Sequence, residues 1–477
     1  MFESSRCHHF HSASRTLSSL LILGSLHLGA VSSFAQSVVP AFKSISTKAV
    51  GGKPSPELPK YVSPFKDWGE RYHFSGAEDI DWLLLGFQHR SRIENFNNFY
   101  RVPSLPSDGG YFSRHWFYLG VRDVLDPFRF TLELEDSRRE GFDFPPSARQ
   151  DNHTDFLQAY AELYFENGPA GQPVSFQAGR FTIDAVDRRL IARNRFRNSA
   201  NTFDGVRLRV GDDKSRWVAN FFATRPVEPR EGSFDDRSRE ERTFYGAYGT
   251  FRTHSPSLVI EPYYFYLDDE RNPVIERQLH TAGVHAYGLL GDGSYDYDLT
   301  ASFQWGDLKG LDHFATFFHA ELGRTFDHPW SPRVSAWLNY GSGDDDPNDQ
   351  DSGRFTELFG APFGLFGFTR YFTASNSINP VLSLSFKPVK DVKVEFYLRS
   401  YSLASDTDAW VRGGRRDPSG GSGRHIGEEL DFRLRWQATD RLLINTGVAH
   451  FMPGSFVDET GPSETSTLGY LQARFDF

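Results

Sequence analysis

The sequence has little cysteine, little methionine and no long apolar run beyond its first residues. Its 477 residues include 1 cysteine and 2 methionines, and only 39% of the residues are hydrophobic. A membrane-spanning helix needs about 20 consecutive apolar residues, and no segment after Val31 approaches that length. These absences exclude a membrane protein built from a bundle of apolar helices.

The one apolar run has the features of a secretory signal. Two arginines precede the apolar stretch 17–31, and a small-x-small motif ends at Ala35, which is the pattern of a cleaved leader. We therefore expect residues 1–35 to be a signal peptide. Because the only cysteine, Cys7, lies in this peptide, the mature chain would have no thiol, which excludes disulfides, cysteine metal sites and cysteine nucleophiles.

Residues 36–81 are rich in proline and lysine, and we interpret them as an extended N-terminal leader. The formal net charge of the whole chain is −10. A net negative charge of this size is not the profile of a nucleic-acid-binding protein.

The chain is rich in aromatic residues, which make up 16% of the total, and it contains 42 glycines. Aromatic residues favour β-strands and glycine favours turns. Stretches of about ten residues alternate strictly between apolar and polar side chains. The clearest examples are Phe128–Glu135, Tyr295–Trp305, Val392–Arg399 and Leu430–Trp436. Alternation of this length is typical of tilted strands that cross a bilayer.

The number of such segments and the way the chain ends favour a barrel over a soluble sandwich. We count eighteen or nineteen candidate strands from Trp82 to Phe477, and the last one, Gly469–Phe477, ends on an aromatic residue. Short turns such as 291–293 alternate with the long polar segments 137–155, 226–241, 341–356 and 402–428.

We therefore predict an all-β fold: residues 82–477 form a transmembrane antiparallel β-barrel of about 18 strands, with short periplasmic turns and long extracellular loops, in the bacterial outer membrane. A secreted β-propeller is the structural alternative, although no repeat of blade length supports it.

If the apolar face of each strand meets lipid, the polar face lines the lumen, and that face is rich in arginine. Arginine binds carboxylates through a planar fork and keeps its charge. The candidate conduit residues are Arg90, Arg92, Arg114, Arg129, Arg180, Arg207, Arg209, Arg399, Arg433 and Arg435. The acidic residues expected to share the lumen are Glu94, Glu133, Glu135, Glu162 and Glu395. The alternative is that most of these charges form structural ion pairs, which leaves the conduit to a few unpaired arginines.

Several short motifs, taken in order, resemble the alginate export family of outer-membrane barrels. They are Arg90-Ser91-Arg92-Ile93-Glu94, Leu132 to Arg138, Leu157-Gln158-Ala159-Tyr160, Gly179-Arg180, Arg189-Leu190-Ile191, and Asn198 followed by Thr202 to Arg207. In the later half, Ser342-Gly343-Asp344 and Phe355 to Phe359 also fit. The resemblance implies an eighteen-stranded pore with an electropositive, arginine-lined conduit gated by loops.

The chain also departs from the family pattern. Phe181 stands where a glutamine is usual, Phe196 stands where a tryptophan is usual, and Phe366-Gly367-Phe368-Thr369 replaces an expected His-Gly element followed by aspartate. The departures are compatible with transport of some substrate, but they weaken the inference that the substrate is alginate.

One acidic loop offers oxygen ligands of the kind that Ca²⁺ prefers. Its candidate ligands are Asp344, Asp346, Asn348, Asp349 and Asp351. The loop lacks the glycine and the final glutamate of an EF-hand, so a solvated acidic loop is the alternative.

No other cofactor is expected. The sequence contains neither a Gly-x-Ser-x-Gly elbow nor a His-Glu-x-x-His zinc pair, and we expect no enzyme activity.

Together these features predict an outer-membrane channel for the passive export of an anionic, alginate-like polysaccharide. The expected partners are outer-membrane lipids, the polysaccharide or another acidic solute, and periplasmic export components, with no nucleic acid. The alternatives are a general or small-anion porin and, in a different class, a plugged barrel that acts as an adhesin or a hydrolase.

Overall fold

The computed structural model describes residues 80–101, 107–252, 257–271, 276–346 and 348–476. The predicted signal peptide and all but the last two residues of the predicted leader lie outside the described residues. Within them the chain is almost entirely β-sheet.

Eighteen long strands follow one another along the chain. They are β1 (Leu83–Asn97), β2 (Ser107–Val121), β3 (Phe128–Glu140), β4 (Asn152–Phe165), β5 (Val174–Phe181), β6 (Phe203–Val210), β7 (Trp217–Glu228), β9 (Arg242–Arg252), β10 (Val259–Asp269), β11 (Arg277–Leu290), β12 (Tyr295–Leu308), β13 (Leu311–Thr325), β14 (Arg333–Gly341), β16 (Ser377–Val389), β17 (Val392–Ser402), β18 (His425–Gln437), β19 (Leu442–Pro453) and β20 (Ser466–Asp476). Two short strands, β8 (Arg237–Ser238) and β15 (Asp351–Ser352), lie in connections.

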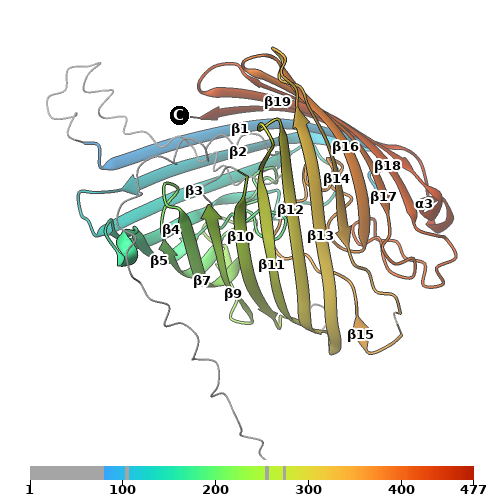
Figure 1. The fold of residues 1–477 in the computed structure, drawn as a ribbon, viewed down its shortest axis with the longest axis horizontal. Helices are drawn as coiled ribbons and strands as arrows, with labels where there is room; N and C mark the ends of the chain where they lie inside the picture. Colours follow the sequence, from blue (N-terminus) through green and yellow to red (C-terminus); the bar gives the residue numbers. More distant parts are fainter. Residues whose placement is uncertain (1–79, 102–106, 253–256, 272–275, 347, 477) are drawn as a thin grey trace, which may run out of the picture. The chain divides into compact units, whose positions relative to one another are not determined.

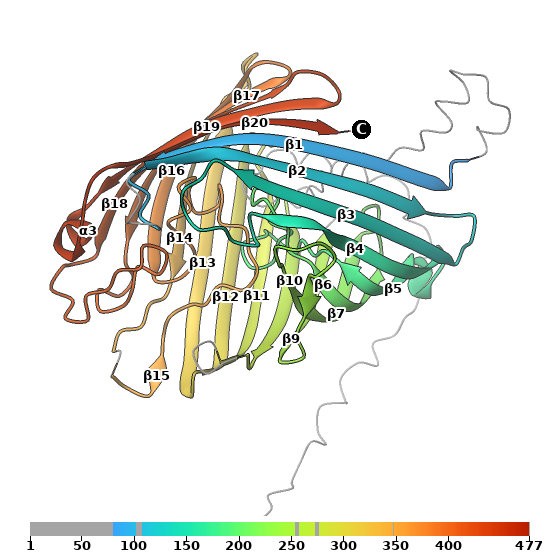
Figure 2. The same cartoon turned by 180° about the vertical axis from the view of Figure 1, so that it is seen from behind.

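Each long strand pairs antiparallel with the next one, and the last pairs with the first. Ile93 of β1 lies opposite Leu471 of β20, which closes the sheet into a barrel. Figures 1 and 2 show β20 (red) beside β1 (blue) and the other strands side by side in chain order. Closure gives every strand a hydrogen-bonding partner on both sides, which a bilayer core requires because it offers no water to a free edge. The predicted fold class and strand number are confirmed.

The alternation in sequence becomes an inner and an outer face. In β3, Phe128 and Phe130 are 55% and 43% exposed, whereas Glu133 and Glu135 are buried. The same separation holds in β1, where Ile93 is exposed and Arg92 is buried. Apolar side chains thus face outward and polar side chains face the lumen, as in a membrane barrel.

The connections differ at the two ends of the barrel. The end that carries the connections 122–127, 291–294 and 390–391 is called the short-turn end here, and the opposite end, with 141–151, 342–376 and 403–424, the long-loop end. Three predicted loops, 137–155, 226–241 and 402–428, were too long, because strands continue into them. The predicted loop 341–356 was too short, because the connection between β14 and β16 runs on to residue 376. One connection at the long-loop end, Lys309-Gly310, is as short as a hairpin turn.

Helix is scarce: the described residues include a single turn of 3-10 helix at Pro169–Gly171 and α3 at Ser455–Thr460. No helix in this part of the chain is long and apolar enough to cross a membrane.

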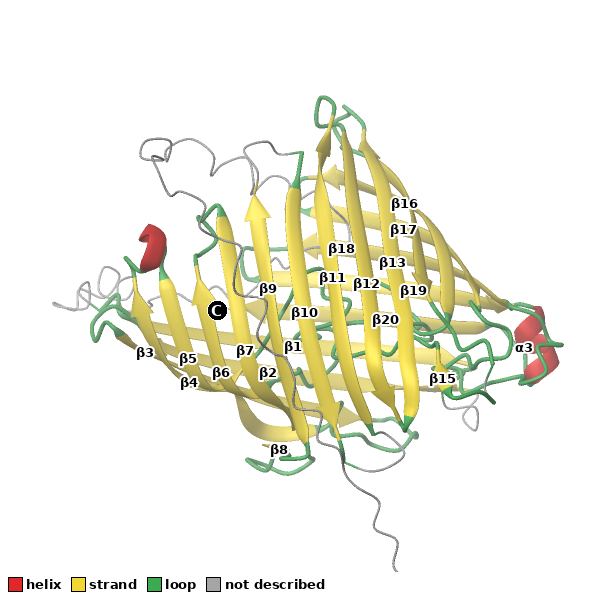
Figure 3. Cartoon of the chain, turned by 60° about the horizontal axis from the view of Figure 1, so that its bottom comes forward, coloured by secondary structure: helices red, strands yellow, loops and turns green. Residues whose placement is uncertain are grey.

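Two connections turn inward instead of projecting from the barrel. Residues 182–202, between β5 and β6, are called the first inner segment, and residues 353–376, between β15 and β16, the second inner segment. Every residue of both segments is buried or half-buried, and Ile191 and Phe368 are fully covered. Figure 3 shows such loops (green) between the strands of the wall. The lumen is therefore partly filled by the chain itself.

Candidate functional site

Two arginines of the inner wall hold the first inner segment by its backbone. Arg90 of β1 donates hydrogen bonds to the carbonyl oxygens of residues 195–197 at 2.6 to 3.3 Å and to Asn198 Oδ1 at 2.6 Å. Arg114 of β2 donates to the carbonyl oxygens of Arg195 and Arg197 at 2.9 and 3.2 Å. Both guanidinium groups are buried. The guanidinium supplies several donors in a fixed plane, which suits a run of carbonyl oxygens.

Acidic residues of β3 hold the same segment from the neighbouring wall. Glu133 accepts from Arg193 at 2.7 Å, and Glu135 accepts from the backbone N–H of Ala200 at 3.0 Å. On another part of the wall, Thr300 of β12 donates to Asp187 at 2.8 Å. The first inner segment is thus tied to widely separated strands of the barrel.

The second inner segment is anchored by other strands. Glu94 of β1 accepts from Arg370 at 3.0 Å, and Arg399 of β17 donates to the carbonyl oxygen of Gly364 at 3.0 Å. Glu429 of β18 accepts from the backbone N–H of Phe368 at 2.7 Å.

The two inner segments also pair with each other. The backbone N–H of Ala192 donates to the carbonyl of Phe359 at 3.0 Å, and the N–H of Phe359 donates to the carbonyl of Leu190 at 2.8 Å. This short parallel pairing joins residues more than 160 positions apart. Together the two segments form a constriction across the lumen.

The other predicted conduit residues lie in different surroundings. Arg92 pairs with Glu94 at 2.8 Å, and Arg129 pairs with Asp123 and Asp126 in a turn at the short-turn end. Arg180 pairs with Asp204 at 2.7 Å and Arg209 with Asp213 at 2.9 Å. Arg207 donates to Gln177 at 2.9 Å.

On β17, Glu395 is surrounded by cations of its own strand and of β18. Arg433, Arg435 and Lys393 lie 2.7, 3.1 and 2.9 Å from its carboxylate. Glu162 accepts a hydrogen bond from Gln177 at 3.0 Å. Most of the predicted lumenal charges are therefore paired or hydrogen-bonded, and the conduit role of the ten arginines stays a prediction.

A cavity of about 530 Å³, the outer chamber, lies between the inner segments and the long-loop end. Eight arginines line it, against two acidic residues, Glu94 and Glu357. The arginines are Arg101, Arg149, Arg197, Arg242, Arg271, Arg277, Arg370 and Arg412. None of them belongs to the predicted set, because they lie on loops, inner segments and strand ends and not within the regular alternation of long strands.

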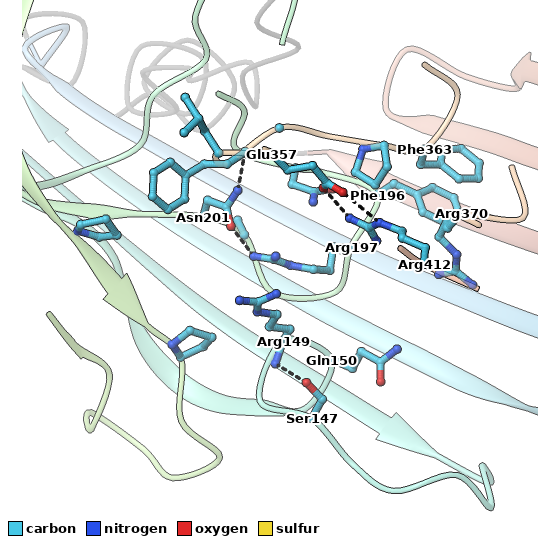
Figure 4. Close-up of a pocket in the computed structure, with 18 of the residues that line it drawn as sticks. Ser147, Arg149, Gln150, Phe196, Arg197, Asn201, Glu357, Phe363, Arg370 and Arg412 are labelled. Atoms are coloured by element: carbon cyan, nitrogen blue, oxygen red, sulfur yellow. Dashed lines mark hydrogen bonds and ion pairs between the residues drawn. The ribbon is translucent and has the colours of Figure 1, made fainter. Parts of the chain in front are cut away.

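Three arginines of the outer chamber form no ion pair with a carboxylate of the described residues: Arg101, Arg149 and Arg197. Arg197 is held by the carbonyl of Ser199 at 2.7 Å and by Asn201 at 2.5 Å. Figure 4 shows Arg149 beside Arg197, and Arg412 joined to Glu357. Burial and the nearby Arg149 lower the pKa of Arg197 to about 9, so the guanidinium keeps its charge at neutral pH.

The remaining arginines of the outer chamber are paired. Arg242, Arg271 and Arg277 surround Asp269 at 3.3, 2.6 and 3.5 Å, and Asp269 is the carboxylate that all three share. Arg271 also pairs with Glu228, which in turn pairs with Arg239, so four cations share two anions and positive charge remains in excess. The outer chamber is thus electropositive both by count and by pairing.

A second cavity, the inner chamber, has a volume of about 110 Å³ and lies toward the short-turn end. Arg188, Arg189 and Arg433 line it together with Glu321. Glu321 and Arg433 are each four residues from the short-turn end of their strands.

The predicted calcium loop uses its oxygens within local turns. Asp346 accepts from the backbone N–H of Asn348 at 3.0 Å, and Asp349 accepts from that of Asp351 at 2.9 Å. Asp344 accepts from Gly353 at 3.1 Å. In the part of the chain that the structure describes, the three acidic side chains whose oxygens lie within 4.8 Å of one another are instead Asp155, Asp235 and Asp236. Calcium binding by the predicted loop stays a prediction.

The profile of the alginate export family matches residues 81–470. The chain belongs to the alginate export family. A search of curated proteins found no match.

Solved outer-membrane proteins share the fold of this family member. Pseudomonas aeruginosa OccK8 (OprE) matches with a TM-score of 0.58 and 13% identity, over 83% of this chain and 98% of that one. Pseudomonas aeruginosa OpdO gives 0.56 and 12%, over 83% and 97%. Acinetobacter baumannii OccAB2 gives 0.57 and 9%, over 82% and 98%. Family and fold together make this protein an outer-membrane channel barrel.

Proposed function

We propose that this channel exports an anionic, alginate-like polysaccharide passively, with the arginines of the outer chamber as its electrostatic guide. The observation that carries the proposal is the excess of arginine over acidic residues there, eight to two. The proposal includes removal of residues 1–35 on the way to the outer membrane and delivery of the polymer by periplasmic export components.

Arg101 and Arg149 supply the freest positive charge of the outer chamber. Neither guanidinium makes a hydrogen bond to the described residues, and both side chains are exposed to the lumen. Such groups can bind a carboxylate and release it again, because no fixed partner must be displaced or restored. Several weak sites in succession let a charged chain advance, whereas one strong site would retain it.

The small inner chamber favours a second candidate function, a channel for small acidic solutes. Its volume of about 110 Å³ is a fifth of that of the outer chamber, so it holds only a much smaller solute than the outer chamber does. The two candidates share the anion preference and differ in whether a polymer enters.

Planar-bilayer recording of the refolded chain separates these candidates. The reversal potential in a KCl gradient gives the anion preference, and alginate oligomers added to one side test for block of the current. Arg149→Gln and Arg101→Gln should each lower the anion-to-cation permeability ratio, by about two-fold when combined. Arg424→Gln, whose charge is paired with Asp406 and which lines neither chamber, is the matched control.

Each result has a clear reading. Anion-selective current that alginate blocks supports polysaccharide export, and anion-selective current that alginate leaves unchanged supports the small-solute channel. A permeability ratio unaffected by the two substitutions contradicts the role of the outer chamber. Absence of current would favour the plugged barrel.

A further inference from the structure

A pair of stacked phenylalanines stands between the two chambers. Phe196 belongs to the first inner segment and Phe363 to the second, and their rings are parallel within 3° with centroids 3.3 Å apart. Phe196 lines the outer chamber, and Phe363 lines both chambers. Figure 4 shows the two rings side by side at the edge of the outer chamber.

The pair is supported from the barrel wall. Tyr470 of β20 meets both rings edge-on, at 5.3 Å from Phe196 and 5.8 Å from Phe363. Phe368 stacks on Phe363 at 4.8 Å, and the guanidinium of Arg92 lies 4.2 Å above the ring of Phe196. These contacts favour one position for each ring, because aromatic pairs and cations over rings have defined geometries.

The rings themselves are only partly covered. Phe196 and Phe363 are both half-buried, whereas Phe368 beneath them is fully buried. The two rings thus place apolar surface between two cavities that both carry arginines in their lining. A narrow apolar constriction resists both water and ions, since neither finds a polar partner there.

We propose that Phe196 and Phe363 form an aromatic septum between the outer and inner chambers, and that this septum sets the size of the solute that passes. The two rings come from different inner segments, so a small separation of the segments opens the septum without any change in the barrel wall. The septum lies beside Phe366-Gly367-Phe368-Thr369, where the sequence departs from the family pattern. The inference concerns ion passage as well as polymer passage and does not depend on the proposed substrate.

The first test compares single-channel conductance in KCl, with no polymer present. Phe363→Ala and Phe196→Ala should each raise the conductance, by about two-fold or more, and the larger Phe363→Trp should lower it. The matched control is Phe372→Ala. Phe372 stacks on Tyr401 with the same geometry, 3.3 Å and 4°, but lines neither chamber. Correct folding of each variant is checked by its heat-dependent shift in gel mobility.

The second test uses a thiol placed at the septum and does not rely on the alanine variants. Cys7 is the only cysteine of the chain, and a refolded chain that begins at residue 36 lacks it. Phe363→Cys in this chain therefore carries a single thiol. A charged methanethiosulfonate reagent should then change the current of Phe363→Cys and leave that of Phe372→Cys unaltered.

Two results would overturn the septum. One is a folded Phe363→Ala barrel with the conductance of the parent chain. The other is a Phe363→Cys channel whose current is indifferent to the reagent after mass spectrometry has shown that the thiol is modified. Because neither measurement involves polysaccharide, failure of the export proposal leaves both tests interpretable.

Discussion

At the scale of single residues, the partner of a charge decides its role. Arg90 and Arg149 are both arginines of the lumen, but Arg90 is buried against four acceptors of the first inner segment, whereas Arg149 faces the outer chamber with its guanidinium free. Alternation in sequence identifies the side of the strand on which Arg90 lies. It carries no information about Arg149, which belongs to a loop.

A half-buried carboxyl in the connection between β7 and β9 gives a pH-dependent prediction. Burial and the neighbouring Asp155 raise the pKa of Asp236 to about 6, although its oxygens accept from the N–H of Arg230 at 2.6 Å and from Asn152 at 2.8 Å. The unfolded chain binds this proton only near pH 3.9. The folded state therefore gains stability as pH falls through about 6, and this contribution is lost as pH rises.

The measurement compares the parent chain with Asp236→Asn. Moving from pH 7.5 to pH 5 should stabilise the parent relative to the variant by about 1 kcal/mol, after allowance for solvent screening of a half-buried side chain. Urea unfolding in detergent micelles, followed by tryptophan fluorescence, gives both free energies of unfolding. Equal pH dependence in the two proteins would contradict the prediction.

At the scale of elements, the first inner segment is held mainly by hydrogen bonds to its backbone. Its carbonyl oxygens at residues 195–197 accept hydrogen bonds from Arg90 and Arg114. This arrangement explains why the constriction keeps its shape although the segment contains no regular secondary structure.

Arg90→Ala should loosen the first inner segment. Loss of one buried charged donor group with four acceptors costs about 3 kcal/mol, and the current should become noisier because the constriction fluctuates. Arg129→Ala is the control: its ion pairs lie in an exposed turn, where the cost is below about 1 kcal/mol. Unfolding free energies and single-channel recordings check both variants, and a quiet, fully stable Arg90→Ala channel would refute the anchoring role.

At the scale of the whole molecule, closure of the sheet through β1 and β20 is the feature on which every other depends. The ten-residue register from Gln88 to Asn97 against β20 removes the two edges that an open sheet would expose to lipid. Each unpaired backbone group in that environment costs several kcal/mol.

Truncation after Pro462 should therefore abolish insertion. Without β20, both β1 and β19 lose a partner, and the chain should give no heat-modifiable band and no current in bilayers. Deleting Gly420 and Gly421, in the connection between β17 and β18 outside every strand, is the matched control and should leave the barrel intact. A truncated chain that still forms a heat-modifiable barrel would show that closure does not need β20.

The sequence by itself determined the wall of this protein: the all-β class, the eighteen strands, the lipid-facing side of each and the aromatic end of the last. It could do so because alternation with a period of two is a local property of a strand. The contents of the lumen were decided only by the tertiary structure. The inner segments have no period, and their positions depend on contacts such as Phe359 with Leu190 and Arg370 with Glu94, between residues far apart in the chain. The electropositive outer chamber and the stack of Phe196 on Phe363 arise from those long-range contacts, because each brings together side chains that no local pattern relates.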